Sequence, residues 1–167
     1  MKKMRTIMLE PLTQASFEPY GELLLRPSNG RIYFEESLSN NRADAWPSLS
    51  LAVREEVSEL PFVATQMERH AFSSQSFIPM EAGRWIVAVA PHAKEGGPNT
   101  EALRAFLAEP DQGVTYAADV WHHPLTVIDR PSTFAIMMWR DGTAGDEEFV
   151  TLAEPLCFAS PKFEANT

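Results

Sequence analysis

The chain has 167 residues, of which 44% are hydrophobic and 22% charged, a composition typical of one ordinary globular domain. Its formal net charge is −9, which disfavours nucleic acid or an anionic membrane as a partner, because both bind clustered Lys and Arg. The only cysteine, Cys157, excludes an internal disulfide and a thiolate metal cluster and suits a reducing compartment. After the basic N-terminus, Glu10 and Pro11 interrupt any apolar run like that of a signal peptide, and we expect a cytoplasmic protein.

Short strands separated by turn signals are expected along most of the chain. In order, they span residues 7–9, 22–25, 31–34, 49–54, 66–70, 75–78, 84–90, 103–107, 114–116, 120–123, 125–128 and 134–139. Helix is limited to 14–17, with Thr13 as N-cap, and to a single turn before residue 103, with Thr100 as its cap. The run 84–90 is apolar on both faces, which predicts a central strand, and the acidic tail from Gly142 is expected to be irregular.

This pattern predicts an all-β fold, a sandwich or small barrel with a few short helices. No long stretch has the 3.6-residue periodicity of an amphipathic helix. No internal repeat, low-complexity tract or linker divides the chain, so we expect a single domain over residues 1–167.

A polar pattern over residues 65–83 suggests a functional site. Gln66, Glu68 and His70 alternate along one expected strand, and Gln75 follows after a short turn. Because alternate side chains of a strand share a face, a carboxylate, an imidazole and an amide can converge from two neighbouring strands. A solvent-facing strand or a structural ion pair explains the residue types about equally well.

Adjacent histidines form a second candidate feature. His122 and His123 lie in an expected strand directly before Pro124, which favours extended backbone. Neighbouring residues of a strand point to opposite faces, so only one of the two is expected to face a pocket. The other is expected to pack against the outer layer or a partner subunit.

Arginines are candidates for binding a substrate carboxylate, because a guanidinium group donates two parallel hydrogen bonds. The four considered are Arg69, Arg84, Arg104 and Arg140. For any one of them, a surface ion pair with the abundant Glu and Asp is the more common role. The sequence has no Gly-rich phosphate loop, G-x-S-x-G, H-E-x-x-H or Cys-His metal pattern.

Five segments together resemble one known family. They are Met67-Glu68-Arg69-His70, the stretch 75–80, the stretch 103–106, the stretch 112–116 and the stretch 120–125. With the opening Pro11 to Glu22 and the closing 154–159, they make nearly the whole chain similar to ureidoglycolate lyase, also called ureidoglycolate hydrolase. The resemblance implies a cupin-like antiparallel double-stranded barrel (a jelly roll) that forms a homodimer.

The resemblance also implies an activity and the residues that carry it. The activity is that of a carbon–nitrogen lyase of the amidine-lyase type, which cleaves ureidoglycolate to glyoxylate and urea in allantoin and purine degradation. We expect Arg104 to hold the substrate carboxylate. The predicted catalytic residues are Glu68, His70 and His122, and the predicted substrate-binding residues are Gln75, Arg104, Tyr116 and His123.

The same positions bear on metal binding. In metal-binding cupins the first motif supplies two His and a Glu, and a later motif supplies a further His. Here Glu68, His70 and Gln75 correspond to the first three and His122 to the last, so one His is replaced by Glu and the Glu by Gln. We therefore expect no cofactor, although these side chains could hold a hard divalent ion weakly. Two other hypotheses stay open, a metal-dependent cupin isomerase or dioxygenase acting on another small acid, and a non-enzymatic ligand-binding module.

Overall fold

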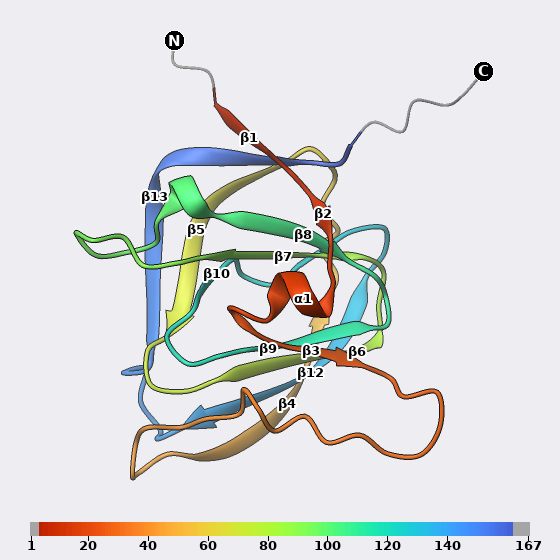
Figure 1. Ribbon diagram of the computed structural model, residues 1–167, viewed down its shortest axis with the longest axis vertical. Coiled ribbons are helices and arrows are strands. Elements are labelled where there is room, and N and C mark those ends of the chain that lie inside the picture. The colour runs from red at the N-terminus through yellow and green to blue at the C-terminus, as the bar shows by residue number, and fades with distance from the viewer. Residues whose placement is uncertain (1–3, 162–167) are drawn as a thin grey trace.

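The computed structural model describes residues 4–161, and β-strands make up most of it (Figure 1). Two mostly antiparallel sheets face each other in a nearly closed barrel. Across the larger sheet the order is β1 (Arg5–Met8), β13 (Glu147–Ala159), β5 (Phe62–His70), β10 (Trp121–His122), β7 (Trp85–Ala90), β8 (Arg104–Ala108) and β2 (Glu10–Pro11), with β11 (Thr126–Val127) also paired to β7. Across the smaller sheet the order is β3 (Gly21–Leu25), β9 (Gln112–Tyr116), β6 (Gln75–Glu81), β12 (Ser132–Arg140) and β4 (Trp46–Arg54). The architecture confirms the predicted all-β class and is consistent with the cupin-like fold.

The two predicted helical segments are present, and polar side chains cap both. In α1 (Gln14–Phe17) the Thr13 hydroxyl accepts a hydrogen bond from the Ser16 amide, and the Ser16 hydroxyl accepts one from the Thr13 amide. This reciprocal pair satisfies donors that the first turn leaves free. The second segment is a 3₁₀ turn, Thr100–Ala102, whose cap is Asn99 rather than the predicted Thr100. No helix within residues 4–161 is long and apolar enough to cross a membrane.

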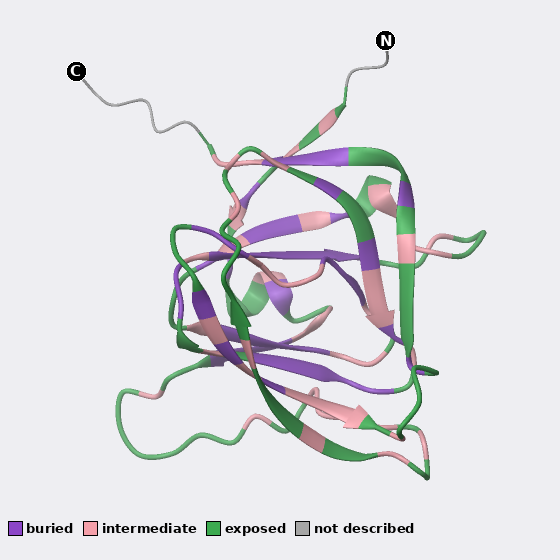
Figure 2. Cartoon of the chain, turned by 180° about the vertical axis from the view of Figure 1, so that it is seen from behind, coloured by how far each residue is buried: buried purple, intermediate pink, exposed green. Residues whose placement is uncertain are grey.

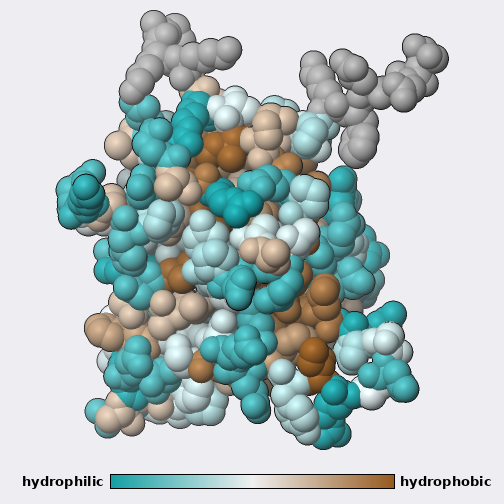
Figure 3. Space-filling view, in the orientation of Figure 1, coloured by the Kyte–Doolittle hydropathy of each residue, from teal (hydrophilic) through white to brown (hydrophobic). Residues whose placement is uncertain are grey.

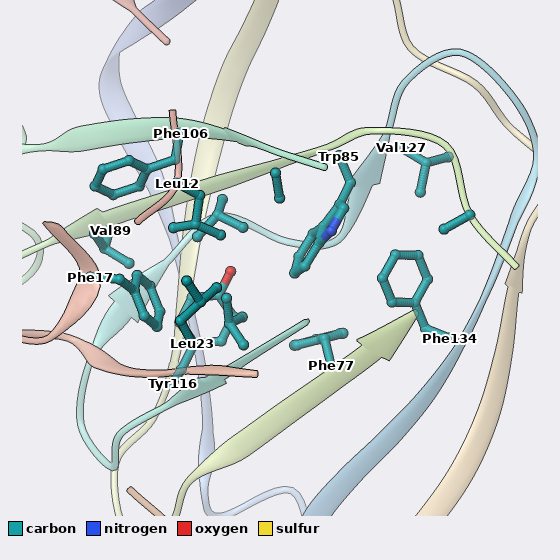
Figure 4. Close-up of a cluster of buried hydrophobic side chains, with 14 of the residues drawn as sticks. Leu12, Phe17, Leu23, Phe77, Trp85, Val89, Phe106, Tyr116, Val127 and Phe134 are labelled. Atoms are coloured by element: carbon teal, nitrogen blue, oxygen red, sulfur yellow. The ribbon is translucent and has the colours of Figure 1, made fainter. Parts of the chain in front are cut away.

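Core packing explains why β7 is apolar on both faces. Trp85, Val87 and Val89 point into the core between the two sheets, where aromatic rings from both sheets and from α1 meet (Figure 4). The alternate residues Ile86 and Ala88 pack in a second cluster on the opposite face of the larger sheet. All six residues of β7 are therefore buried, as predicted.

Three elements differ from the sequence-based prediction. Residues 31–34 form no strand, and β6 continues through Pro79, where the pairing with β12 shifts by a bulge. The tail expected to be irregular forms β13, the longest strand, which pairs with β5 along most of its length. The acidic residues and Pro155 obscure the strand pattern in the sequence. Pro155 lies where the register with β5 shifts, so its missing N–H removes no hydrogen bond of that ladder.

Candidate active site

His122 lies at the centre of a buried polar cluster inside the barrel. It sits on β10 directly opposite Glu68 of β5, and its Nε2 is 3.2 Å from Glu68 Oε1. The same nitrogen is 3.2 Å from Oε1 of Gln75, which begins β6 in the other sheet. Its Nδ1 is 2.9 Å from the carbonyl oxygen of Val120. The cluster therefore joins the two sheets through one imidazole.

The partners of the His122 ring nitrogens are all oxygen atoms. Nδ1 faces the Val120 carbonyl, and Nε2 faces the Glu68 carboxylate and the Gln75 amide oxygen. His122 is thus surrounded by hydrogen-bond acceptors and is paired with Glu68. Burial raises the pKa of Glu68, but the hydrogen bond and charge of His122, with smaller effects of His70 and His123, outweigh it and leave the pKa below its usual value. The pair therefore supplies a positioned proton donor.

Tyr116 holds the His122 ring in place by stacking. The two rings lie 4.0 Å apart at their centroids and are 11° from parallel. Tyr116 is paired with Gln75 in the smaller sheet and is 2% exposed. Burial raises the pKa of its hydroxyl far above the usual value, so Tyr116 stays neutral. Tyr116 therefore packs against the His122 ring as an uncharged side chain, and the carboxylate in contact with that ring belongs to Glu68.

His70, at the end of β5, provides a second imidazole with different properties. Its ring is nearly parallel to that of His122, with 6.2 Å between the centroids, and it is 4% exposed. Burial lowers the pKa of His70, and so does the charge of His122, against smaller raising effects of Asp146, Glu68 and Glu147. Near neutral pH His70 is therefore a neutral imidazole that can act as a base.

A cavity of about 410 Å³ opens at His70. Two residues that line it, Arg42 and Trp139, each have a buried N–H donor, Nε and Nε1 respectively, with no acceptor among residues 4–161. The polar lining of this cavity, which includes Arg42, Arg140 and Ser50, suits a small polar molecule. The lining comprises Arg42, Ser48, Ser50, His70, Met138, Trp139, Arg140, Gly142, Thr143, Ala144, Asp146 and Glu147.

Not every predicted site residue joins this cluster. His123 packs edge-on against Phe62 and Phe158, on the side of the larger sheet away from Tyr116, and burial lowers its pKa to about 4. The prediction that the two adjacent histidines face opposite ways is confirmed. Gln66, expected to share a face with Glu68 and His70, is exposed.

Arg104 shares the inner face of the larger sheet with the cluster but points elsewhere. It begins β8 opposite Val89, which in turn pairs with His122, so two strands separate Arg104 from Glu68. Its guanidinium bonds Glu10, with Nη2 to Oε2 at 2.7 Å, and the Ser16 carbonyl at 3.2 Å. The structure does not bring it to His122.

Asp146 and Arg42 are site residues that sequence analysis did not single out. Asp146 Oδ2 lies 3.4 Å from Nδ1 of His70, and Arg42 pairs with Asp146. Asp146 is 76 residues from His70 in a segment expected to be irregular, and Arg42 is in a long connection without strand pattern. No local pattern links them, because the contact depends on the pairing of β13 with β5.

The cluster does not present a metal-ligand set. Among residues 4–161, no three His, Cys, Asp or Glu side chains converge in a way that could hold a metal ion. Nε2 of His122 is 3.2 Å from Glu68 Oε1, and Nδ1 of His70 is 3.4 Å from Asp146 Oδ2.

Comparison with known proteins identifies related chains. The family model described as ureidoglycolate lyase matches residues 4–158. A ureidoglycolate lyase of Burkholderia cepacia is 38% identical over 141 residues, covering 78% of each chain, and one of Burkholderia mallei (strain NCTC 10229) is 35% identical over 144 residues, covering 80% of this chain and 82% of the relative. A ureidoglycolate lyase of Pseudomonas fluorescens (strain SBW25) is 30% identical and covers 93% of this chain and 98% of the relative.

Proposed function

The chain belongs to the ureidoglycolate lyase family, and we propose that it cleaves ureidoglycolate to glyoxylate and urea with His70 and the Glu68–His122 pair. One observation carries this assignment of residues. A buried imidazole with a lowered pKa, His70, lies beside a second buried imidazole, His122, which is paired with the Glu68 carboxylate. Family membership favours a lyase over a metal-dependent enzyme of another class or a binding module without catalysis.

The reaction needs one base and one acid. The substrate carbon carries a hydroxyl, a carboxylate and a ureido nitrogen. A base removes the hydroxyl proton, the oxygen forms a carbonyl as the carbon–nitrogen bond breaks, and an acid protonates the departing nitrogen. One proton moves from oxygen to nitrogen overall, and no redox cofactor is required.

The two histidines suit these opposite roles. His70 is the base, because its lowered pKa keeps it neutral and able to accept the hydroxyl proton. His122 is the acid, because Glu68 keeps the proton on Nε2 ready for the leaving nitrogen. Gln75 directs its carbonyl oxygen to His122, which leaves its amide NH₂ free to donate to the ureido oxygen. The pair separates acid and base by environment, as general acid–base catalysis requires.

The substrate carboxylate needs a cation, and Arg140 is better placed than Arg104. Arg140 ends β12 and lines the cavity at His70, and no carboxylate among residues 4–161 lies within ion-pair distance of it. Arg104 is already paired with Glu10. Arg140→Ala is expected to raise KM for ureidoglycolate by about 10–100-fold, the loss of one charged hydrogen-bond partner. Arg104→Ala is the matched control, and a KM rise in that variant alone would restore Arg104 as the carboxylate ligand.

Product analysis tests the function directly. Purified protein incubated with ureidoglycolate is expected to release glyoxylate and urea in equal amounts, at a rate unchanged by a chelator. Ammonia in place of urea would identify hydrolysis of the ureido group instead of lyase chemistry, and no release at all would contradict the function. Activity lost with a chelator and restored by a divalent ion would support the metal-dependent alternative.

We also propose a homodimer formed through the exposed face of the smaller sheet. Its edge strand β4 is almost entirely exposed (Figure 2), and Leu49, Leu51 and Val53 lie on its outer face. Ile78 and Met80 of β6 extend this apolar surface beyond β12. Hydrophobic side chains also gather beside the segment that follows β3, at the lower right of Figure 3. A long exposed apolar edge strand favours association.

The mass of the protein in solution tests this dimer. Light scattering is expected to give twice the chain mass of 18.7 kDa for the wild type. Leu51→Glu, with a charge at the centre of the apolar surface, should give a folded protein of single-chain mass. Thr65→Glu, at an exposed position on β5 in the other sheet, is the control that should remain dimeric. A monomeric wild type contradicts the proposal.

The family suggests a place for the reaction in metabolism. We propose that the enzyme acts in the cytoplasm, in the degradation of allantoin and purines for nitrogen. Cys157, the free cysteine among the described residues, is buried and suits a reducing compartment. Cells that lack the protein should accumulate ureidoglycolate during growth on allantoin.

A further inference from the structure

A buried carboxylate approaches His70 from outside its own strand. Asp146 lies directly before β13, whose first residue, Glu147, is paired with His70. The Asp146 carbonyl also accepts a hydrogen bond from the Ala71 amide at 3.0 Å. This backbone contact places the Asp146 side chain, which is 5% exposed, against the His70 ring.

Both oxygens of the Asp146 carboxylate have further donors. Oδ1 accepts from the Phe72 amide at 2.7 Å, and Oδ2 accepts a short hydrogen bond from the Ser73 hydroxyl. Arg42 Nη2 lies 3.3 Å from Oδ2 and also donates to the Trp139 carbonyl at 3.0 Å. The carboxylate is therefore held in one orientation by these donors, with Oδ2 also facing Nδ1 of His70.

The contact with His70 determines which ring nitrogen is available. A carboxylate beside Nδ1 favours the tautomer with its proton there. Nε2, at the far side of the ring, then has a lone pair and can accept a proton. The distance of 3.4 Å is long for a hydrogen bond, and such contacts often tighten when substrate is bound.

We propose that Asp146, held by Arg42, is a positioning residue that keeps His70 in the Nδ1–H tautomer with Nε2 ready to take the substrate proton. The proposal rests on the role of His70 as base in ureidoglycolate cleavage. It assigns a function to two residues from segments far from His70 in sequence. Asp146 acts through the imidazole, because both of its carboxylate oxygens are already bonded to Phe72, Ser73 and Arg42.

Charged groups from three elements face His70, and they set the expected pH dependence. His122 of β10 lowers the pKa of His70, as burial does, whereas Glu68 of β5 and Asp146 and Glu147 beside or in β13 raise it. Removal of the charge at position 146 therefore lowers the pKa of His70 further. A base works when it is neutral, so the acidic limb of kcat/KM should move to lower pH in such a variant.

Asp146→Asn tests the proposal. We expect kcat to fall by about 10–100-fold, the usual loss for an outer carboxylate partner of a functional histidine, with KM little changed. The acidic limb should move to lower pH, an effect that a purely structural role in the turn at Phe72 and Ser73 does not produce. Glu148→Gln is the matched control, because it removes a negative charge from β13 that pairs with Arg69 instead. That variant should keep the wild-type kcat and pH profile.

The outcomes separate this proposal from the proposed function. Wild-type protein that releases no glyoxylate and urea contradicts the function itself. Active wild type with an Asp146→Asn variant of unchanged kcat and unchanged acidic limb overturns the positioning role alone. If the variant does not fold, ¹⁵N NMR of wild-type imidazoles decides, because the proposal requires a proton on Nδ1 of His70, and the Nε2–H tautomer contradicts it.

Discussion

Replacement of His70 by glutamine is expected to lower kcat for ureidoglycolate cleavage by about 10²–10⁴-fold, the usual contribution of a general base. Glutamine retains a polar group of similar length but accepts no proton near neutral pH. KM should change less than kcat, because His70 acts on the proton that moves in the transition state. In the wild type, the acidic limb of kcat/KM should lie below about 6.5, the ordinary pKa of histidine, because burial and His122 lower the pKa of His70.

A second histidine provides the control for His70. His92 is 44% exposed at its side chain and lies outside the lining of the cavity at His70. His92→Gln should therefore leave kcat near the wild-type value. Thermal unfolding of both variants establishes that they are folded. Near wild-type turnover in folded His70→Gln would show that His70 is not the base.

Replacement of Glu68 by glutamine is expected to lower kcat by about 10²-fold or more, because His122 loses the carboxylate that keeps it protonated. An amide at position 68 can still hydrogen-bond the ring but does not stabilise its charge. Steady-state kinetics with ureidoglycolate measures this loss.

A double replacement shows whether Glu68 and His122 act as a unit. If they do, the variant with Glu68→Gln and His122→Gln should be little slower than His122→Gln alone, because the second change removes a partner whose effect is already lost. Losses that multiply would mean that the two residues act independently. Glu81→Gln, at an 80% exposed side chain, is the control for loss of a glutamate and should be fully active.

Much of the fold follows from local patterns. The apolar run at β7, the strands β4 and β12 and the Thr13 cap all appear close to where they were predicted, because each depends on neighbours a few residues away. The same alternation correctly places His122 and His123 on opposite sides of the larger sheet. The strand β13 was missed, since its acidic residues and Pro155 hide a pattern that becomes favourable only against β5.

The sequence by itself determined the all-β class, the family and the polar residues at the centre of the site, Glu68, His70, Gln75 and His122. Residue identity and spacing are sufficient for this, because strand alternation directs side chains by a local rule. Tertiary structure alone decided which groups these residues meet. The contact of His70 with Asp146 and the turn of Arg104 toward Glu10 depend on register between segments 76 and 94 residues apart. This register is set by the packing of the whole barrel. It brings Glu68 to His122 and Asp146 to His70, and these contacts give the two histidines their different proposed roles.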